Sequence, residues 1–260
     1  DIGANVTTSA NQTYSDAITL TANSVLMAGG NIDVQEIDGA FDVTLDATGT
    51  LTLNEALGGG TTLNSLTLSG ESVDLPATDV TNGLTVTSTN GDITDVGTIT
   101  VGGNANFTAN GADDDIDLGD LAVTGTISVN TTGSNGDASI TNTTAVDLAT
   151  STVGGDLDVT ATAGGITDSG DLSVGGEASF TSDSITIGES GENTNFGSLT
   201  ADTSGANGNQ IITEDSGLTG LDLDAGSGDV TLNVNGVVTD GDSDTDIEGT
   251  TASVMVGDGT

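Results

Sequence analysis

Carboxylates are the only abundant side chains in this sequence that could do chemistry. The 260 residues include 40 Asp and Glu but no Lys, Arg, His or Cys, which gives a formal charge of −40. Two stretches concentrate these acids, ADDDIDLGD at 112–120 and DGDSDTDIEG at 240–249. Ca²⁺ gathers six to eight oxygen ligands from such alternating acids in loops. The candidate Ca²⁺ ligands are Asp113, Asp115 and Asp117 in the first stretch and Asp240, Asp242 and Asp244 in the second.

The second stretch only partly matches an EF-hand calcium loop. Thr245 stands where that loop requires glycine, and Glu248 falls too early for its bidentate glutamate. Two other interpretations stay open. The acids could be solvated charges at loop corners, or they could attract divalent ions diffusely without a defined site.

The composition excludes several classes of function. A chain without cations cannot neutralise phosphates, so we expect no nucleic-acid partner. Anionic membrane surfaces repel it, and no stretch approaches the roughly 18 apolar residues of a membrane span, so we expect no membrane insertion. Without His or Cys, the usual ligands for Zn, Cu, haem and iron–sulfur clusters are missing. We therefore expect no required cofactor, with Ca²⁺ as the one candidate ion.

Catalysis is not expected either. A glycosidase needs only two suitably spaced carboxylates. Sugar-cleaving sites also use aromatic platforms and cationic anchors, and aromatics are only 2% of this chain. A carbohydrate-active or carbohydrate-binding module stays open as an alternative.

The apolar residues alternate with polar ones, which predicts an all-β fold. Val86 follows Leu84, Val159 follows Leu157, and Leu232 follows Val230, each pair separated by one polar residue. Such period-two spacing, with turn residues between the runs, is typical of short strands with one buried face.

An internal repeat indicates how these strands are arranged. LTVTSTNGDITDVGTITVGGNANFT, from Leu84, aligns without gaps to LDVTATAGGITDSGDLSVGGEASFT, from Leu157, with 15 of 25 positions identical. The offset between the two copies is 157 − 84 = 73. A partial third copy follows Gly228. We expect one continuous array over residues 1–260, with divergent coils at 1–79, one copy at 80–152, a second at 153–227 and a partial third at 228–260.

A shorter period, about 20–22 residues long, lies within each repeat and predicts a parallel β-helix, or β-solenoid. We expect three coils per 73-residue repeat and about 12 coils in all, a rod of roughly 60 Å at about 4.8 Å per strand. Asn-Gly pairs at 82–83, 90–91, 135–136 and 207–208 are expected to turn corners with positive φ. A string of Ig-like, calcium-dependent adhesin domains is the alternative. It fits less well because such domains are longer and have bulkier cores.

The stretches NQTYSDAITL (11–20), GAFDVTLDATGTLTL (39–53) and VGGDLDVTATAGGITDSGDLSVGG (153–176) resemble the repeats of large bacterial exoproteins, the filamentous-haemagglutinin-like adhesins and related β-strand-repeat proteins. The resemblance implies a right-handed parallel β-helix that is secreted and works in surface attachment, in biofilms, or as a stalk. We therefore expect an extracellular or cell-surface structural protein. Its expected partners are further copies of itself in filaments, or a longer chain of the same repeats, and host or surface glycans.

Overall fold

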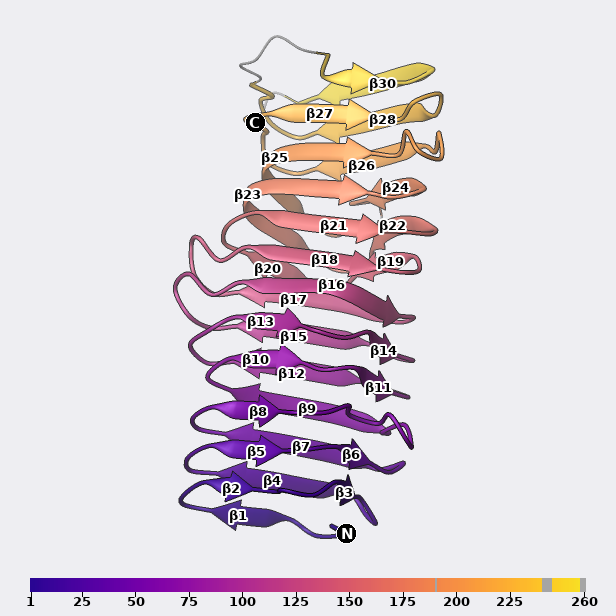
Figure 1. Cartoon of the computed structure of the whole chain (residues 1–260). Coiled ribbons are helices and arrows are strands. Elements are labelled where there is room, and N and C mark those ends of the chain that lie inside the picture. Colours follow the sequence, from indigo (N-terminus) through magenta and orange to yellow (C-terminus); the bar gives the residue numbers. More distant parts are fainter. Residues whose placement is uncertain (190, 240–244, 258–260) are drawn as a thin grey trace.

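Parallel strands stack into a β-solenoid of about 12 coils, as the sequence predicts (Figure 1). The computed structural model describes residues 1–189, 191–239 and 245–257. No helix occurs in these ranges, and every strand pair in them is parallel. The N-terminus lies at one end of the stack and β30 lies at the other (Figure 1).

Most coils contribute strands to three stacks, one on each side of the solenoid. The first stack is β1 (Val6–Thr8), β4 (Ser24–Ala28), β7 (Asp42–Ala47), β9 (Ser65–Gly70), β12 (Leu84–Ser88), β15 (Ala105–Ala109), β17 (Thr126–Thr131), β20 (Ser151–Val153) and the first halves of β23 (Leu172–Thr181) and β25 (Thr194–Asp202).

The second stack begins with the three-stranded sheet of β2 (Gln12–Thr13), β5 (Ile32–Val34) and β8 (Leu51–Leu53). It continues with β10 (Val73–Leu75), β13 (Ile93–Asp95), the start of β16 (Ile116–Val123), β18 (Ala138–Asn142), β21 (Leu157–Ala161), the second halves of β23 and β25, β27 (Leu221–Asp224) and β29 (Ile247–Glu248).

The third stack begins with β3 (Ile18–Thr19), β6 (Ile37–Asp38), β11 (Thr78–Val80), β14 (Ile99–Val101) and the end of β16. It resumes with β19 (Val146–Leu148), β22 (Gly165–Asp168), β24 (Ser184–Ile187), β26 (Gln210–Glu214), β28 (Asp229–Val234) and β30 (Thr251–Val256). β19 also pairs with the start of β17, so the corners of the solenoid shift at this level.

In most strands, alternate residues point into a narrow apolar interior. In β12, Leu84 and Val86 are fully buried while Thr85 between them is exposed. Val86 pairs with Phe107 of β15, and Phe107 pairs with Val129 of β17, so apolar side chains form continuous columns. Burying each such side chain contributes roughly 1.5–3 kcal/mol. The same contribution recurs in every coil.

The internal repeat is not a whole number of coils. Three coils above β12, the first stack reaches β20 and not β21, which contains Leu157, the repeat equivalent of Leu84. β21 lies on the second stack, one side further on. Val230, the equivalent residue in the third copy, lies in β28 of the third stack. The expectation of three coils per repeat is therefore wrong, because each copy advances three coils and one additional side.

Most of the Asn-Gly corners do not need positive φ. Among the four pairs named above, only Asn207 has it, at 56°. Several corner glycines are required for a different reason, namely that neighbouring coils approach them closely. A Cβ on Gly208 would lie 1.7 Å from the carbonyl oxygen of Asp183, and one on Gly103 would lie 1.8 Å from that of Asn82. The expectation of left-handed turns at all four pairs is therefore wrong.

The core columns predict that removing a buried aromatic side chain strongly lowers the stability of the fold. Phe107→Ala should lower the free energy of unfolding by about 3–5 kcal/mol, because the coils above and below hold the vacated space open. The neighbouring Asn106→Ala, at an exposed position, should change it by less than about 0.5 kcal/mol. Urea unfolding followed by circular dichroism measures both, and equal effects would contradict the inward placement of Phe107.

Candidate functional site

The acids of the first predicted cluster spread over different parts of the coil. Asp113 accepts a hydrogen bond from Asn135 Nδ2 (2.9 Å), and Asp115 Oδ1 accepts one from the backbone N–H of Asp137 (2.9 Å). Asp117 lies on β16 and points outward beside Thr94 and Ser139 of neighbouring coils.

Asp240, Asp242 and Asp244 of the second predicted cluster lie outside the described residues. Within the described ranges, no group of three or more acids is arranged to hold a metal ion. Ca²⁺ binding therefore stays a prediction, and the described acids require another explanation.

At one corner of the solenoid, backbone amides donate hydrogen bonds to a series of carboxylates. Asp92, Asp115, Asp137 and Asp156 stand at successive coils, and each carboxylate accepts the N–H of the next acid in the series, ending at Glu177. The four N···O distances are 3.0, 2.9, 2.8 and 2.7 Å. Hydrogen bonds from N–H groups stabilise a carboxylate without a counter-cation. The same bonds satisfy corner amides that no strand ladder reaches.

Acids and hydroxyls alternate along the second stack. The column reads Asp74, Thr94, Asp117, Ser139, Asp158, Ser179, Thr200 and Asp222, one residue per coil. Thr94 Oγ1 donates to Asp74 (3.0 Å), and a hydrogen bond from Ser179 lowers the pKa of Asp158. Burial, followed by the charge of Glu177, outweighs that bond, so the pKa of Asp158 is raised. Paired strands lie about 4.8 Å apart, so Thr94 and Ser139 each separate two carboxylates that would otherwise be close neighbours, and Ser179 and Thr200 together separate Asp158 from Asp222.

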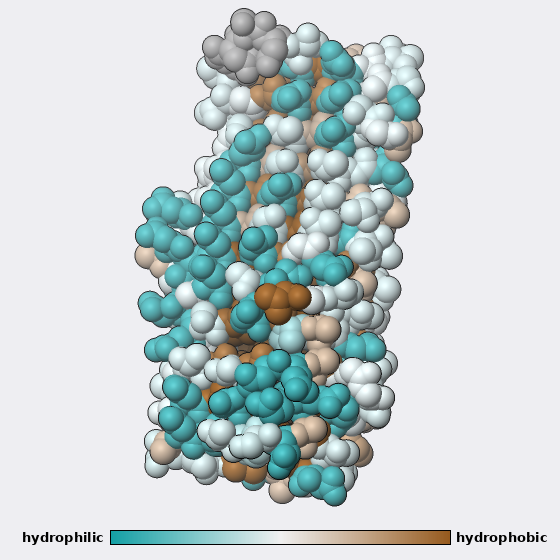
Figure 2. Space-filling view, viewed as in Figure 1, coloured by the Kyte–Doolittle hydropathy of each residue, from teal (hydrophilic) through white to brown (hydrophobic). Residues whose placement is uncertain are grey.

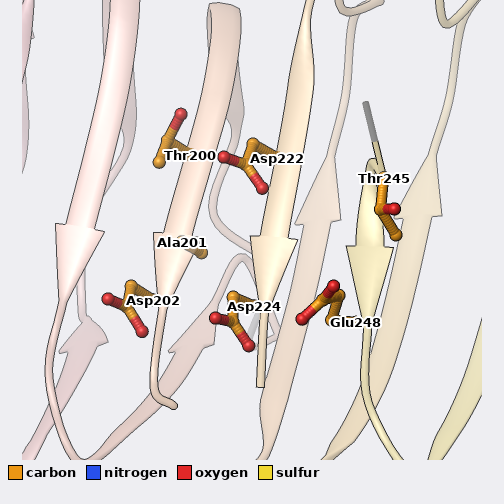
Figure 3. A pocket seen from close by; sticks show the side chains of 7 residues that line it. All are labelled: Thr200, Ala201, Asp202, Asp222, Asp224, Thr245 and Glu248. Carbon is orange, nitrogen blue, oxygen red and sulfur yellow. The ribbon is translucent and has the colours of Figure 1, made fainter. Parts of the chain in front are cut away.

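The alternation ends at the C-terminal coils, where acids line a groove. Asp202, Asp224 and Glu248 follow one another at a single register position on β25, β27 and β29. Asp222 lies two residues before Asp224, in the adjoining column (Figure 3). The hollow measures about 460 Å³, and its other lining residues are Thr200, Ala201 and Thr245.

The groove offers carboxylates and hydroxyls but no aromatic side chain to stack on a sugar. Two of its acids already accept backbone hydrogen bonds, Asp202 from Ser204 and Asp224 from Gly226, each at 2.8 Å. Sequence reasoning missed this arrangement. The detectable signal is the spacing between Asp202 and Asp224, which equals one coil and therefore places two acids side by side.

A second concentration of acids surrounds the end of β22. Asp168 accepts the N–H of Gly188 on both carboxylate oxygens (3.0 and 3.2 Å). Burial, with smaller effects from the charges of Glu192 and Asp147, raises its pKa to about 6. One oxygen of Asp147 and one of Glu192 are buried without a hydrogen-bond partner in the described structure. The carboxyl of Asp168 is therefore protonated only below about pH 6.

These observations define a β-solenoid repeat protein whose acids are held by hydroxyls and backbone amides. The model of the family Repeats of unknown function (DUF5649) matches residues 58–130 and 135–195, so the chain belongs to this family. The first matched segment, 58–130, is as long as the internal repeat. No curated protein and no solved structure matches the chain. No helix long and apolar enough to cross a membrane occurs among the described residues.

The alternating column predicts that a third consecutive acid is destabilising. Thr94→Asp removes the hydroxyl between Asp74 and Asp117 and should cost about 1 kcal/mol more than Thr67→Asp, whose paired neighbours are Thr44 and Thr85. Urea unfolding at 20 mM and 1 M NaCl measures the difference. We expect salt to reduce it, since screening weakens repulsion between exposed charges. A difference that does not depend on salt would exclude repulsion as the cause.

The raised pKa of Asp168 predicts that the free energy of unfolding falls as the pH rises. The folded state binds this proton more tightly than the unfolded state, so the stabilisation is complete below about pH 4 and is lost as the pH rises through about 6. Asp168→Asn should remove that loss, a gain of about 1 kcal/mol at pH 7. Partial exposure reduces it from the roughly 3 kcal/mol of a two-unit shift. Thermal unfolding of both proteins at pH 4 and pH 7 tests this, and parallel pH dependence in the two would contradict it.

Proposed function

We propose that this chain is a rigid, acidic segment of a bacterial extracellular structural protein, such as a surface filament, a stalk or a giant adhesin. The supporting observation is the unbroken coil-to-coil pairing between β1 and β30. A rod whose coils are all joined by parallel ladders resists bending and holds whatever it carries at a fixed distance. Such a role requires no catalysis.

Composition supports a position outside the cell. Proteases that require Lys or Arg before the cleaved bond have no target anywhere in the chain. The charge of −40 keeps rods apart until salt or divalent ions screen it, and Ca²⁺ enters the proposal in that screening role. The resemblance to filamentous-haemagglutinin-like adhesins favours the same location and adds surface glycans as candidate partners.

The last described strand supports continuation of the rod. β30 pairs with β28 on one side only within the described residues, and Val254 and Val256 are 43% and 52% exposed. The residues beneath them, Leu232 and Val234, are buried. An unpaired edge with exposed apolar groups is a template for another strand. We infer that a further coil of this kind stacks on β30, from the same chain or from a second copy.

The carbohydrate-active alternative has weaker support. The acid-lined groove between β25 and β29 is the best candidate site for it, but its lining includes no aromatic residue. No observation therefore favours this alternative over the structural role.

Surface labelling tests the proposal. An antiserum raised against the purified chain should label intact cells of the organism that encodes it, as seen by immunogold electron microscopy. An antiserum against a cytosolic protein, which should label only permeabilised cells, is the control. If the first antiserum also labelled cells only after permeabilisation, the extracellular role would be overturned.

A further inference from the structure

One side of the solenoid carries no acid over several consecutive coils. We call it the neutral face, and it consists of the outward side chains of β9, β12, β15 and β17. These are Thr67 and Ser69, Thr85 and Thr87, Asn106 and Thr108, and Asn130 with Ser128, of which Ser128 is buried. The column through Thr87 and Asn130 continues without charge through Thr152, Ser173 and Asn195. Figure 2 shows the contrasting side, where hydrophilic residues spread over the second stack.

Most polar groups of the neutral face are free, unlike those of the acidic second stack. The outward side chains of β9, β12 and β15 make no hydrogen bond within the described structure. The two residues on β17 are the exception, since they bond to the backbone of the next coil and to each other. On the second stack, by contrast, Thr94 bonds to Asp74 and Thr200 bonds to Glu177. The neutral face therefore presents a regular array of unused donors and acceptors.

Absence of charge is a property of this side of the solenoid and not of the repeat position. Asp158 of β21 is the repeat equivalent of Thr85, and the two differ because they lie on different stacks. The opposite exchange occurs where Asp79 of β11 becomes Thr152 in the next copy, on the neutral column. In both cases the acid stands away from the neutral face and threonine stands on it.

We propose that the neutral face is a lateral pairing surface for a second copy of this chain. The charge determines where a second copy can approach. Two copies that each carry −40 repel each other wherever carboxylates would face carboxylates, and the neutral face has none. Hydroxyl and amide groups both donate and accept hydrogen bonds, so such a face is complementary to itself. Two copies also share the spacing of about 4.8 Å between coils, so each rung of one can meet a rung of the other.

The size of the face predicts a weak contact. A five-residue strand spans about 17 Å, and four to seven coils span about 19–34 Å, which gives roughly 300–600 Å² per copy. This is at or below the size of transient interfaces. Association should therefore require high protein concentration and enough salt to shorten the range of the residual repulsion to a few ångströms.

Two substitutions at equivalent repeat positions test the proposal. Thr87→Asp places an acid on the neutral face, between Ser69 and Thr108. Thr160→Asp makes the same change in the next copy, between Thr141 and Thr181 on the second stack. Both threonines are half-buried and pair with uncharged residues, and the two variants have the same net charge.

Sedimentation velocity at millimolar protein and 0.5 M NaCl is the measurement. The unaltered chain and Thr160→Asp should form dimers with a wider cross-section, and Thr87→Asp should weaken the dimer at least tenfold. Thr85→Asp, at an exposed position on the same face, should repeat that loss if Thr87→Asp proves unstable in a urea titration. Dimers that lengthen without widening would show end stacking instead. That outcome, equal weakening by both variants, or a chain that stays monomeric would each overturn lateral pairing.

Discussion

Everything in this molecule depends on the hydrogen bonds that join each coil to the one below. They fix the separation of neighbouring strands at about 4.8 Å and so force residues one coil apart into columns. Inside, this constraint is favourable, because columns such as Val86–Phe107–Val129 fill a narrow interior without large aromatic clusters. Outside, it brings the acids of successive coils close together in a chain that has no basic side chain with which to neutralise them.

The chain meets that electrostatic cost in two ways. At the corner of Asp92 and Asp115, each carboxylate accepts a hydrogen bond from a backbone N–H of the next coil. The bond stabilises the negative charge and gives the corner amide a hydrogen-bond partner. On the second stack, hydroxyls separate the acids. Where burial outweighs such a hydrogen bond, as at Asp168, the pKa of the carboxyl rises to about 6. These arrangements reduce the repulsion within a dense acidic surface.

Period-two spacing and the repeat were sufficient to predict an all-β solenoid and the average length of its coils. The predicted number of coils per repeat was wrong because identical residues show that two segments share an origin. They do not show which strands of the solenoid pair with each other. Leu84 and Leu157 are equivalent by descent but lie on different stacks. The groove at Asp202 and Asp224 was missed for a related reason, since the coils differ in length. The coil from Leu66 to Leu84 is shorter than the one from Ile185 to Gln210. Without the register, side-by-side acids cannot be distinguished from acids on different sides.

The extra side traversed by each repeat has a consequence for how such an array could grow. If a gene segment encoding one repeat were duplicated, the new copy would face a different direction from its parent, and only the fourth copy would face the original way again. Outward side chains of one type, such as acids, would thus lie on a different side of the rod in each successive copy. Keeping one flank distinct would require each new copy to diverge at its outward positions, and the exchanges between Thr85 and Asp158 and between Asp79 and Thr152 are substitutions of that kind.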